Sequence, residues 1–307
     1  MDINRANMNE LFTGFNMLFQ KGLSSAPHEY EKYTTTITSN TAANTYPYLE
    51  QFGRMREWIG DRKKRNIASQ KLEVFNRDFE DTVVVPRNDI EDDQYALYGT
   101  LIQMLGQNAA QIWGDLAVEA LLGGETREWA DALPFFSAVR KYGEESVINN
   151  LGSAPLTAEA YGAARSAMLS FRGHDGRALR VRPNLLIVGP SNEGAANDIV
   201  KASSRLVAST VANGDNTEVI SGAIQNTWAG TAQIVIEPDL GSEWFLADTT
   251  GALKPVVVQK RKDVKLTRMD HETDDNVFMA KEYIYGTDAR GEAFLSFPHL
   301  IYGSFPA

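Results

Sequence analysis

The chain has 307 residues, of which 43% are hydrophobic and 23% are charged, and its formal net charge is -10. An acidic chain does not attract nucleic acid through its overall field, because phosphate binding depends on clustered lysine and arginine. The absence of cysteine excludes disulfides, thiolate metal sites and a cysteine nucleophile. The first residues lack a signal-peptide pattern and no run approaches 18 apolar residues, so we expect neither a leader nor a membrane span.

Residues 1–28 have the pattern of a short amphipathic helix that ends near residue 22. A helix this apolar needs a partner surface, and two arrangements are open. The helix folds back on its own domain, or it forms an arm on a neighbouring subunit. In the second case three aromatic residues lie in the interface, Phe12, Phe15 and Phe19. The threonine- and asparagine-rich residues 33–45 have the composition of an extended linker.

Residues 61–86 have the pattern of a charged hairpin. Its two strand-like segments are residues 71–75 and 82–85, and the tip falls at 66–70 or 76–78. A two-stranded ribbon this polar is not stable alone in water, so we expect it to pack on its own domain or on another chain. Four consecutive basic residues lie at its base, Arg62, Lys63, Lys64 and Arg65. Such a run is commonly a solvated face, and the alternatives are contact with an acidic neighbour or with nucleic acid.

Apolar residues recur at steps of three and four from residue 95 to residue 121, which predicts a long helix over 92–122. At about 1.5 Å per residue it is roughly 45 Å long, well beyond the average helix. We expect Asp89, Asp92 and Asp93 to cap its first turn. We expect Gly123 and Gly124 to end it in the left-handed conformation. Other elements of the domain would lie across this helix.

The second half of the chain mixes helices and strands. Residues 156–171 predict a helix capped by Thr157, residues 172–177 predict a turn, and Leu185–Val188 predicts a strand buried on both faces. Ser191 or Asn192 would cap the helix that follows. Further strands are expected at 233–237, 244–248 and 255–259, with a charged loop over 260–275. The last element is a hairpin of 277–285 and 294–297 around a turn at 286–291.

The strand-turn-helix at residues 189–194 has the topology of a phosphate loop or a nucleophile elbow, but its sequence is GPSNEG. It lacks the lysine of a phosphate loop. It also carries Glu193 where an elbow around Ser191 requires glycine. The acidic cluster around His271 lacks the glycine-punctuated spacing of a calcium loop, and no histidine pair has zinc-site spacing. We therefore expect no catalytic residue, no metal site and no cofactor.

The order of the predicted parts is more informative than any motif: an N-terminal arm, a charged hairpin, a long helix, an α/β insertion and a closing antiparallel sheet. This order resembles the major capsid protein of tailed phages, an α+β fold of the Hong Kong 97 type. More narrowly, the chain is similar to the Mu-like prophage major head subunit (gpT) family. The segments that carry the resemblance are NTYPYLEQF (44–52), REWIGDR (56–62), FEDTVVVPRNDIEDD (79–93), RALRVRPNLLIVGPSNEGAA (177–196) and DDNVFMAKEYIYGTDARGEAFLSFPHLIYGS (274–304).

The resemblance implies a division of the chain into an arm, a peripheral domain and an axial domain. The arm would be residues 1–45. The peripheral domain would comprise 46–125 and 261–307, with the extended loop at 61–86 and the spine helix at 92–122. The axial domain would be residues 126–260, with its tips around the pentamer and hexamer axes.

The resemblance also implies a function. The chain would assemble with itself, as hexamers and pentamers, into the icosahedral shell around phage double-stranded DNA, in the cytoplasm of a bacterial host. Portal, scaffold and decoration proteins would be its other partners, and no membrane is involved. Two alternatives are an encapsulin-like nanocompartment shell and a serine hydrolase that uses Ser191.

Overall fold

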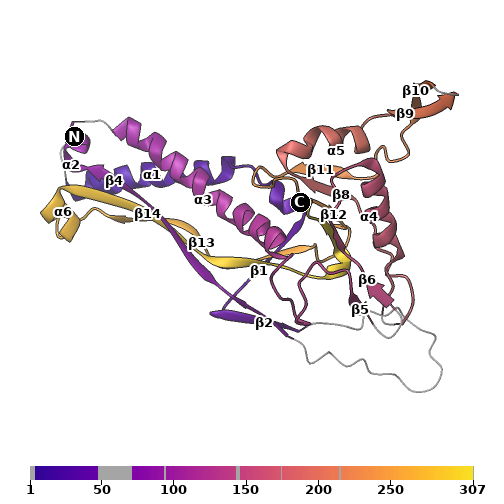
Figure 1. The fold of residues 1–307 in the computed structure, drawn as a ribbon. Helices are drawn as coiled ribbons and strands as arrows, with labels where there is room; N and C mark the ends of the chain where they lie inside the picture. Colours follow the sequence, from indigo (N-terminus) through magenta and orange to yellow (C-terminus); the bar gives the residue numbers. More distant parts are fainter. Residues whose placement is uncertain are drawn as a thin grey trace, which may run out of the picture.

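The computed structural model describes residues 4–47, 71–92, 95–142, 146–173, 175–213 and 216–306. The described chain is elongated, with a four-stranded sheet beside two helices at one end and a five-stranded sheet at the other (Figure 1). The long helix α3 (Tyr95–Gly123) runs from the first end towards the second. None of the described helices combines the length and the apolar character that crossing a membrane requires.

The four-stranded sheet packs with α3 and α1 (Arg5–Ser25) at one end of the molecule, and these elements together are called the peripheral domain below. Its strand order is β1-β13-β14-β4, with β1 parallel to β13 and the other neighbours antiparallel. Helix α3 packs against β13, β14 and β4. Along β14 buried and half-buried residues alternate, as expected for a strand with one face on a core. The strand bounds are Thr34–Thr38, Val256–Met269, Glu282–Leu295 and Arg77–Pro86 in that spatial order.

Helix α1 folds back along α3 of its own chain, so the first alternative for this segment is the one that the structure shows. The two helices come close because Gly106 has no side chain: a Cβ atom there would lie 2.3 Å from the carbonyl oxygen of Phe19. Phe15 packs edge-on against Tyr285 of β14, with ring centroids 5.2 Å apart. Phe15 and Phe19 are fully buried by these contacts. The assignment of these two residues to a subunit interface was therefore wrong.

The five-stranded sheet has the order β11-β8-β12-β15-β7, and it is called the axial domain below together with the helices that pack on it. Strand β8, next to the central strand β12, is buried at every residue, as predicted, and pairs with β11 in parallel and β12 in antiparallel orientation. Helices α4 (Ala158–Ser170) and α5 (Glu193–Val200) pack on this sheet, and Thr157 caps α4 as predicted. The strand bounds in spatial order are Gln233–Ile236, Leu185–Val188, Trp244–Ala247, Ile301–Ser304 and Leu151–Gly152.

Three two-stranded ribbons complete the chain. They pair β2 with β3, β5 with β6, and β9 with β10. The β9–β10 ribbon projects from the axial domain beside α5 (Figure 1). The ribbon bounds are Ala43–Pro47, Lys71–Phe75, Arg140–Tyr142, Ser146–Ile148, Ser204–Asn213 and Asn216–Gln225. The short helices are η1 (Glu29–Lys32), α2 (Arg87–Glu91), η2 (Pro190–Asn192), α6 (Asp275–Ala280) and η3 (Pro298–Leu300).

The long helix begins later than predicted, because α2 precedes it as a separate element. Asp89 lies inside α2 and accepts a hydrogen bond from the Tyr98 hydroxyl, and Asp92 ends α2. Neither therefore caps α3, and Asp93 lies outside the described residues. The helix ends at Gly123, but neither Gly123 nor Gly124 has a positive φ. Gly124 is needed for packing instead, since a Cβ atom there would lie 2.5 Å from Cδ1 of Leu295.

The predicted hairpin is paired differently from the expectation. Strands β3 and β4 both form, but β3 pairs with β2 and β4 pairs with β14. Asn76 joins β3 to β4, and its side chain donates hydrogen bonds to the carbonyls of residues 41 and 42. Because β3 and β4 do not pair with each other, residues 76–78 are not the tip of a hairpin. The first part of the predicted loop, including the alternative tip at 66–70, lies outside the described residues.

The predicted hairpin of residues 277–285 and 294–297 is wrong, because the structure forms a different hairpin from β13 and β14. Strand β13 continues through the charged residues 260–269, with register irregularities between Lys260 and Lys265 that accommodate them. Strand β14 passes straight through the predicted turn at 286–291. Gly291 serves close packing there, since a Cβ atom would lie 2.4 Å from the carbonyl oxygen of Gln259. The reversal occurs at α6 instead, which ends at Lys281 with a left-handed φ of 57°.

The strand pairing of three segments differs from the predicted division of the chain into domains. Strand β1 lies within the predicted arm but belongs to the peripheral sheet. Strand β13 crosses the predicted boundary at residues 260 and 261 without a break. Strand β15 lies within the predicted peripheral domain but pairs with β12 and β7 of the axial sheet. Backbone pairing over long sequence distances decides each of these cases.

Candidate assembly surfaces

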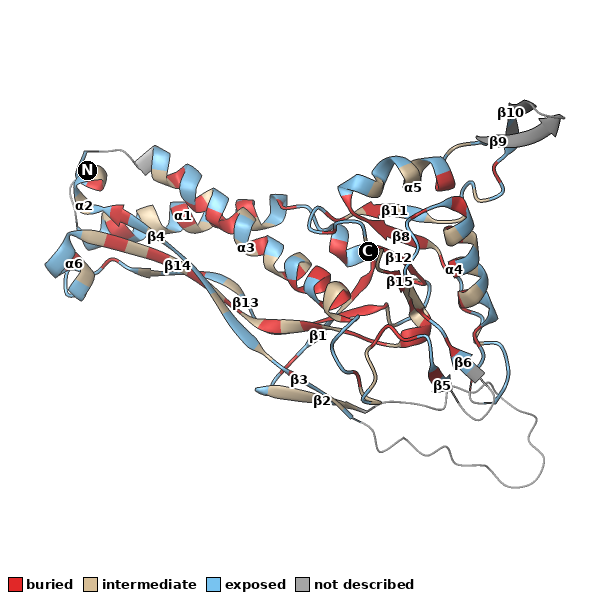
Figure 2. Cartoon of the chain, in the orientation of Figure 1, coloured by how far each residue is buried: buried red, intermediate tan, exposed pale blue. Residues whose placement is uncertain are grey.

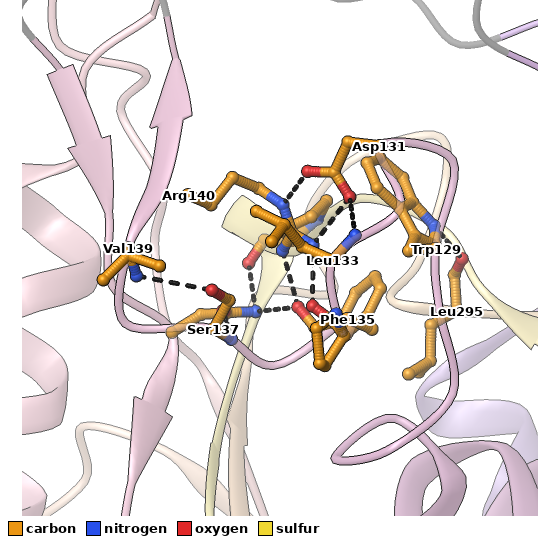
Figure 3. A network of polar contacts seen from close by, with 11 residues as sticks. Trp129, Asp131, Leu133, Phe135, Ser137, Val139, Arg140 and Leu295 are labelled. Carbon is orange, nitrogen blue, oxygen red and sulfur yellow. Dashed lines mark hydrogen bonds and ion pairs between the residues drawn. The ribbon is translucent and has the colours of Figure 1, made fainter.

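The segment between α3 and the axial sheet is held by one buried cation, Arg140 (Figure 3). Its Nε donates to Asp131 Oδ2 at 2.6 Å, while Nη1 and Nη2 donate to the carbonyl oxygens of Phe135 and Pro134 at 2.6 and 2.8 Å. Its Cζ also lies 5.2 Å from the ring centroid of Trp129. A guanidinium is suited to this place because its donors diverge in a fixed plane.

The same segment is tied to both domains. The indole nitrogen of Trp129 donates to the carbonyl of Leu295, at the end of β14, at 3.2 Å. The side-chain amide of Asn150 is buried and donates to the carbonyl of Phe135 at 3.2 Å and to the carbonyl of Ile301, at the start of β15, at 3.4 Å. This network therefore fixes the axial domain against the peripheral domain within one chain.

A second buried contact joins the end of η1 to the axial sheet. The Tyr33 hydroxyl donates to Oε1 of Glu237 at 2.8 Å, and both residues are buried. Burial raises the pKa of the Glu237 carboxyl, and the nearby Glu29, Asp239 and Asp115 raise it further. The Tyr33 hydrogen bond opposes that rise, because it stabilises the charged form.

The tip of the peripheral domain exposes apolar side chains. Phe278 and Met279 of α6 are each 80% exposed, and α6 lies at the end of the molecule farthest from the axial domain (Figure 2). The helix is anchored beneath them by the buried Val277. The side-chain amide of Asn276 also donates to the carbonyls of Met269 and Glu282 at 3.1 and 2.7 Å. Anchored apolar side chains at such a tip are typical of a protein interaction site.

Helix α3 exposes a second apolar row. Leu97, Leu101 and Met104 are 61%, 38% and 50% exposed and lie one helical turn apart, so they share one face. The apolar pattern of residues 95–121 includes Leu97 and Leu101, but the structure leaves both exposed. The buried face comprises Ile102, Leu105 and the residues that continue it towards Leu121. The 3.6-residue period could not separate two apolar faces on one helix.

The predicted interface residues fall into three groups. Phe15 and Phe19 are in the core of their own chain. Phe12 is half-buried, with the Cζ atom of Arg268 4.3 Å from its ring centroid. Arg62, Lys63, Lys64 and Arg65 lie outside the described residues. Sequence reasoning missed Phe278 and Met279; two large apolar residues in a charged stretch were the available signal.

The residues considered for chemistry have structural roles in the described chain. Ser191 Oγ donates to the carbonyl of Gly241 at 2.8 Å, and the Asn192 amide donates to the carbonyl of Ser242 at 3.0 Å. Asn192 is the N-cap residue of α5, which is one of the two predicted positions, but its side chain makes no capping hydrogen bond. His271 is exposed, and its backbone N–H donates to Asp274 at 2.9 Å. Over the described ranges, no group of three or more His, Asp or Glu side chains is placed to hold a metal ion.

Comparisons with known sequences cover nearly the whole chain. The sequence profile of the family described as Mu-like prophage major head subunit gpT matches residues 8–153, 148–240 and 225–306. The Mu-like prophage FluMu major head subunit of Haemophilus influenzae is 26% identical over 300 residues, which are 97% of this chain and 73% of that protein. The major capsid protein of Escherichia phage Mu is 24% identical over 299 residues, with the same shares.

Solved structures of capsid and particle proteins also match this chain. A chain of the procapsid of bacteriophage JBD30 is 28% identical with a TM-score of 0.60, and the match covers 99% of this chain and 77% of that one. A chain of the virus-like particle from Pyrococcus furiosus is 11% identical with a TM-score of 0.55, covering 95% and 98%. The second likeness shows the fold alone.

The long helix across a four-stranded sheet, the separate five-stranded domain and these likenesses define a phage capsid protein of the Hong Kong 97-type fold. The chain belongs to the Mu-like prophage major head subunit (gpT) family. It is a major capsid protein of a phage head, a structural protein and not an enzyme.

Proposed function

We propose that this chain assembles with itself, as hexamers and pentamers, into an icosahedral shell that encloses phage double-stranded DNA. The observation that carries the proposal is the pair of exposed apolar surfaces, the α6 tip with Phe278 and Met279 and the α3 row with Leu97, Leu101 and Met104. A single folded subunit gains nothing from holding these side chains in water. Burying them at about 25 cal/mol per Å² in repeated contacts would stabilise a closed shell.

In this proposal the axial domain packs around the pentamer and hexamer axes. Within residues 61–86, β3 and β4 pair with strands of their own chain, so the contact with an adjacent subunit is proposed for the part of this segment that lies outside the described residues. The net charge of -10 suits a wall around DNA rather than a sequence-reading surface. DNA contact would therefore be non-specific.

We also infer the wider assembly from the relatives. One solved structure is a capsid of bacteriophage JBD30 decorated with minor capsid protein trimers. By analogy, this chain would meet decoration proteins on its outer surface, along with scaffold and portal proteins during assembly in the host cytoplasm. The shell would then be part of the virion.

Electron microscopy of the purified full-length chain tests the proposal. We expect pentamers, hexamers or closed shells, and a mass by light scattering far above that of one subunit. A stable monomer at high concentration would contradict it. Isolation of native particles tests the contents: packaged double-stranded DNA supports the phage head, whereas shells filled with a cargo enzyme and free of DNA would favour the nanocompartment.

A further inference from the structure

A groove lies between α3 and three strands of the peripheral sheet, β13, β14 and β4. It has a volume of about 250 Å³. Its apolar middle takes one residue from each element, namely Ile112 of α3, Val264 of β13, Ala289 of β14 and Phe79 of β4. Phe79 and Ala289 are partners in the β4–β14 register, so their side chains lie on the same face of the sheet. Helix and sheet therefore build the apolar middle together.

Helix α3 and strand β14 run past each other in the same direction, which orders the groups along the groove. Leu105 of α3 belongs to the same buried cluster as Tyr285 of β14. Further along both elements, a Cβ atom on Gly291 of β14 would lie 2.6 Å from Cζ3 of Trp113 of α3. Asp115 lines the groove and follows Trp113 on the helix, so it lies at the end of the groove nearer Gly291.

Asp81 and Thr287 form the other end of the groove and are partners across β4 and β14. Their side chains share one face, with Cβ atoms about 4.5–5.5 Å apart. Thr287 is only 5% exposed, and within the described chain its Oγ1 has no hydrogen-bond partner. Asp81 Oδ1 accepts a hydrogen bond from the backbone N–H of Thr82 at 2.9 Å, and no described group donates to Oδ2. A buried hydroxyl without a partner beside such a carboxylate indicates a place for a hydrogen-bond donor.

The carboxylates at the two ends have no cation from their own chain. Within the described residues, no lysine or arginine forms an ion pair with Asp81 or Asp115. Partial burial raises the pKa of the Asp115 carboxyl, and the nearby Asp239 raises it further. A cation from outside the chain would therefore stabilise the charged form at both ends.

A carboxylate at each end of an apolar middle selects the kind of ligand that fits. An ammonium group has three N–H donors, so one ammonium between Asp81 and Thr287 can donate to both side chains. Methylene groups suit the apolar middle, as the stem of a lysine suits an apolar surface. Strand β14 rises about 7 Å from Thr287 to Ala289, which is the length of a short alkyl chain. A second ammonium at the far end of such a chain then meets Asp115.

We propose that this groove binds a short linear diamine, with one ammonium between Asp81 and Thr287 and the other at Asp115. A single metal ion would meet only one end of the groove, and a lysine side chain carries only one ammonium. The inference goes beyond the proposed function and does not rest on it, because every group of the site belongs to one chain.

Calorimetric titration of the full-length chain with 1,5-diaminopentane tests the proposal. In about 0.15 M salt, which screens the net charge of -10, we expect saturable binding of one diamine per chain. The amine 1-aminopentane keeps the stem but has one ammonium, and it should bind about tenfold more weakly. The uncharged 1,5-pentanediol should not bind. A monoamine that binds as tightly as the diamine would overturn the two-ended site.

Carboxylate variants locate the ligand. Asp81→Asn and Asp115→Asn should each weaken diamine binding about tenfold, because each removes one ion pair. Glu80→Gln is the matched control: Glu80 precedes Asp81, but its partner is Asp288 and its side chain lies on the opposite face of the strands. This control should bind the diamine like the wild type. Equal losses at positions 80 and 81 would show diffuse attraction to an acidic surface and would overturn the proposal.

The variant Thr287→Val separates a binding role from a structural one. Valine keeps the shape of threonine and removes the hydroxyl, so diamine binding should weaken about threefold or more. The ligand-free variant should unfold at the same temperature as the wild type or a higher one, because it no longer buries a hydroxyl without a partner. A variant that keeps the full affinity would contradict the place given to the first ammonium.

The remaining outcomes separate this inference from the proposed function. A chain that forms shells but takes up no diamine overturns the groove site and leaves the shell proposal standing. A chain that stays monomeric and binds the diamine with the expected losses in the variants overturns the proposed function and supports the site.

Discussion

A Cβ atom on Gly22 of α1 would lie 2.1 Å from the carbonyl oxygen of Gln103 of α3. The obstacle is backbone rather than a flexible side chain, so neither helix can give way without moving. This approach lets Phe15 and Phe19 reach the core of the peripheral domain. The N-terminal helix is thereby a structural part of its own subunit.

The substitution Gly22→Ala should lower the free energy of unfolding by about 1–3 kcal/mol, because overpacking forces the two helices apart. Denaturant unfolding followed by circular dichroism measures the effect. Gly14 of the same helix is the matched control, since a Cβ atom there meets nothing within 4 Å. Gly14→Ala should raise stability by about 0.5–1 kcal/mol. Equal effects at the two positions would contradict the close crossing.

Arg140 should be irreplaceable by lysine. We expect Arg140→Lys to destabilise nearly as much as Arg140→Met, about 3–5 kcal/mol, because one ammonium cannot reach Asp131 and the two carbonyls together. Thermal unfolding of the three proteins measures the difference. Arg127, whose ion pair with Glu119 is exposed, is the control, and Arg127→Lys should change stability by less than about 0.5 kcal/mol. A lysine variant as stable as the wild type would show that charge alone suffices at residue 140.

Tyr33→Phe removes the hydrogen bond to the buried Glu237 carboxylate and should cost about 1.5–3 kcal/mol at pH 8. The cost should shrink as the pH falls, because Glu237, whose pKa burial already raises, then takes up a proton. Unfolding at pH 8 and pH 5 tests both statements. Tyr30→Phe removes a hydroxyl three residues away and should show no such pH dependence. A cost at position 33 that does not change with pH would argue against a charged Glu237.

His299 should make the subunit less stable in acid. Burial lowers its folded-state pKa from 6.5 to about 4, so the unfolded chain binds a proton that the folded chain does not. Stability that is present above pH 6.5 is then lost as the pH falls towards 4, by up to about 3 kcal/mol. Buried carboxyls with a raised pKa, such as Asp270, act in the opposite direction. The test is therefore the difference between wild type and His299→Asn at each pH, which should narrow towards pH 4. Parallel pH profiles would contradict the assignment.

The α6 tip should act in assembly and not in folding. Phe278→Ser combined with Met279→Ser should leave the unfolding free energy within about 0.5 kcal/mol, since both side chains are exposed. The same variant should need a higher protein concentration to form shells, measured by light scattering. Glu272→Ser, an exposed polar change in the adjacent turn, should assemble normally. Normal assembly of the tip variant would remove this surface from the set of contacts.

Local patterns in the sequence were sufficient to predict the elements that depend only on residues close together in the chain. The long helix, the strand Leu185–Val188 and the helix capped by Thr157 each follow from periodicity, an apolar run or a capping residue. The ordered set of segments was also enough to indicate the capsid family, because the resemblance spans nearly the whole chain.

Only the tertiary structure decided which strands pair, which apolar faces are covered and why particular glycines are required. β3 pairs with β2 instead of β4, and β15 crosses to the axial sheet, through contacts between residues far apart in the chain. Gly291 resembles a turn residue in sequence, yet it lies in a straight strand against Gln259 and Trp113. The same limit applies to Leu97 and Phe15, which have the same apolar character although one is exposed and the other buried. Hydrophobicity is a property of one residue, whereas burial depends on the neighbours that the fold brings to it.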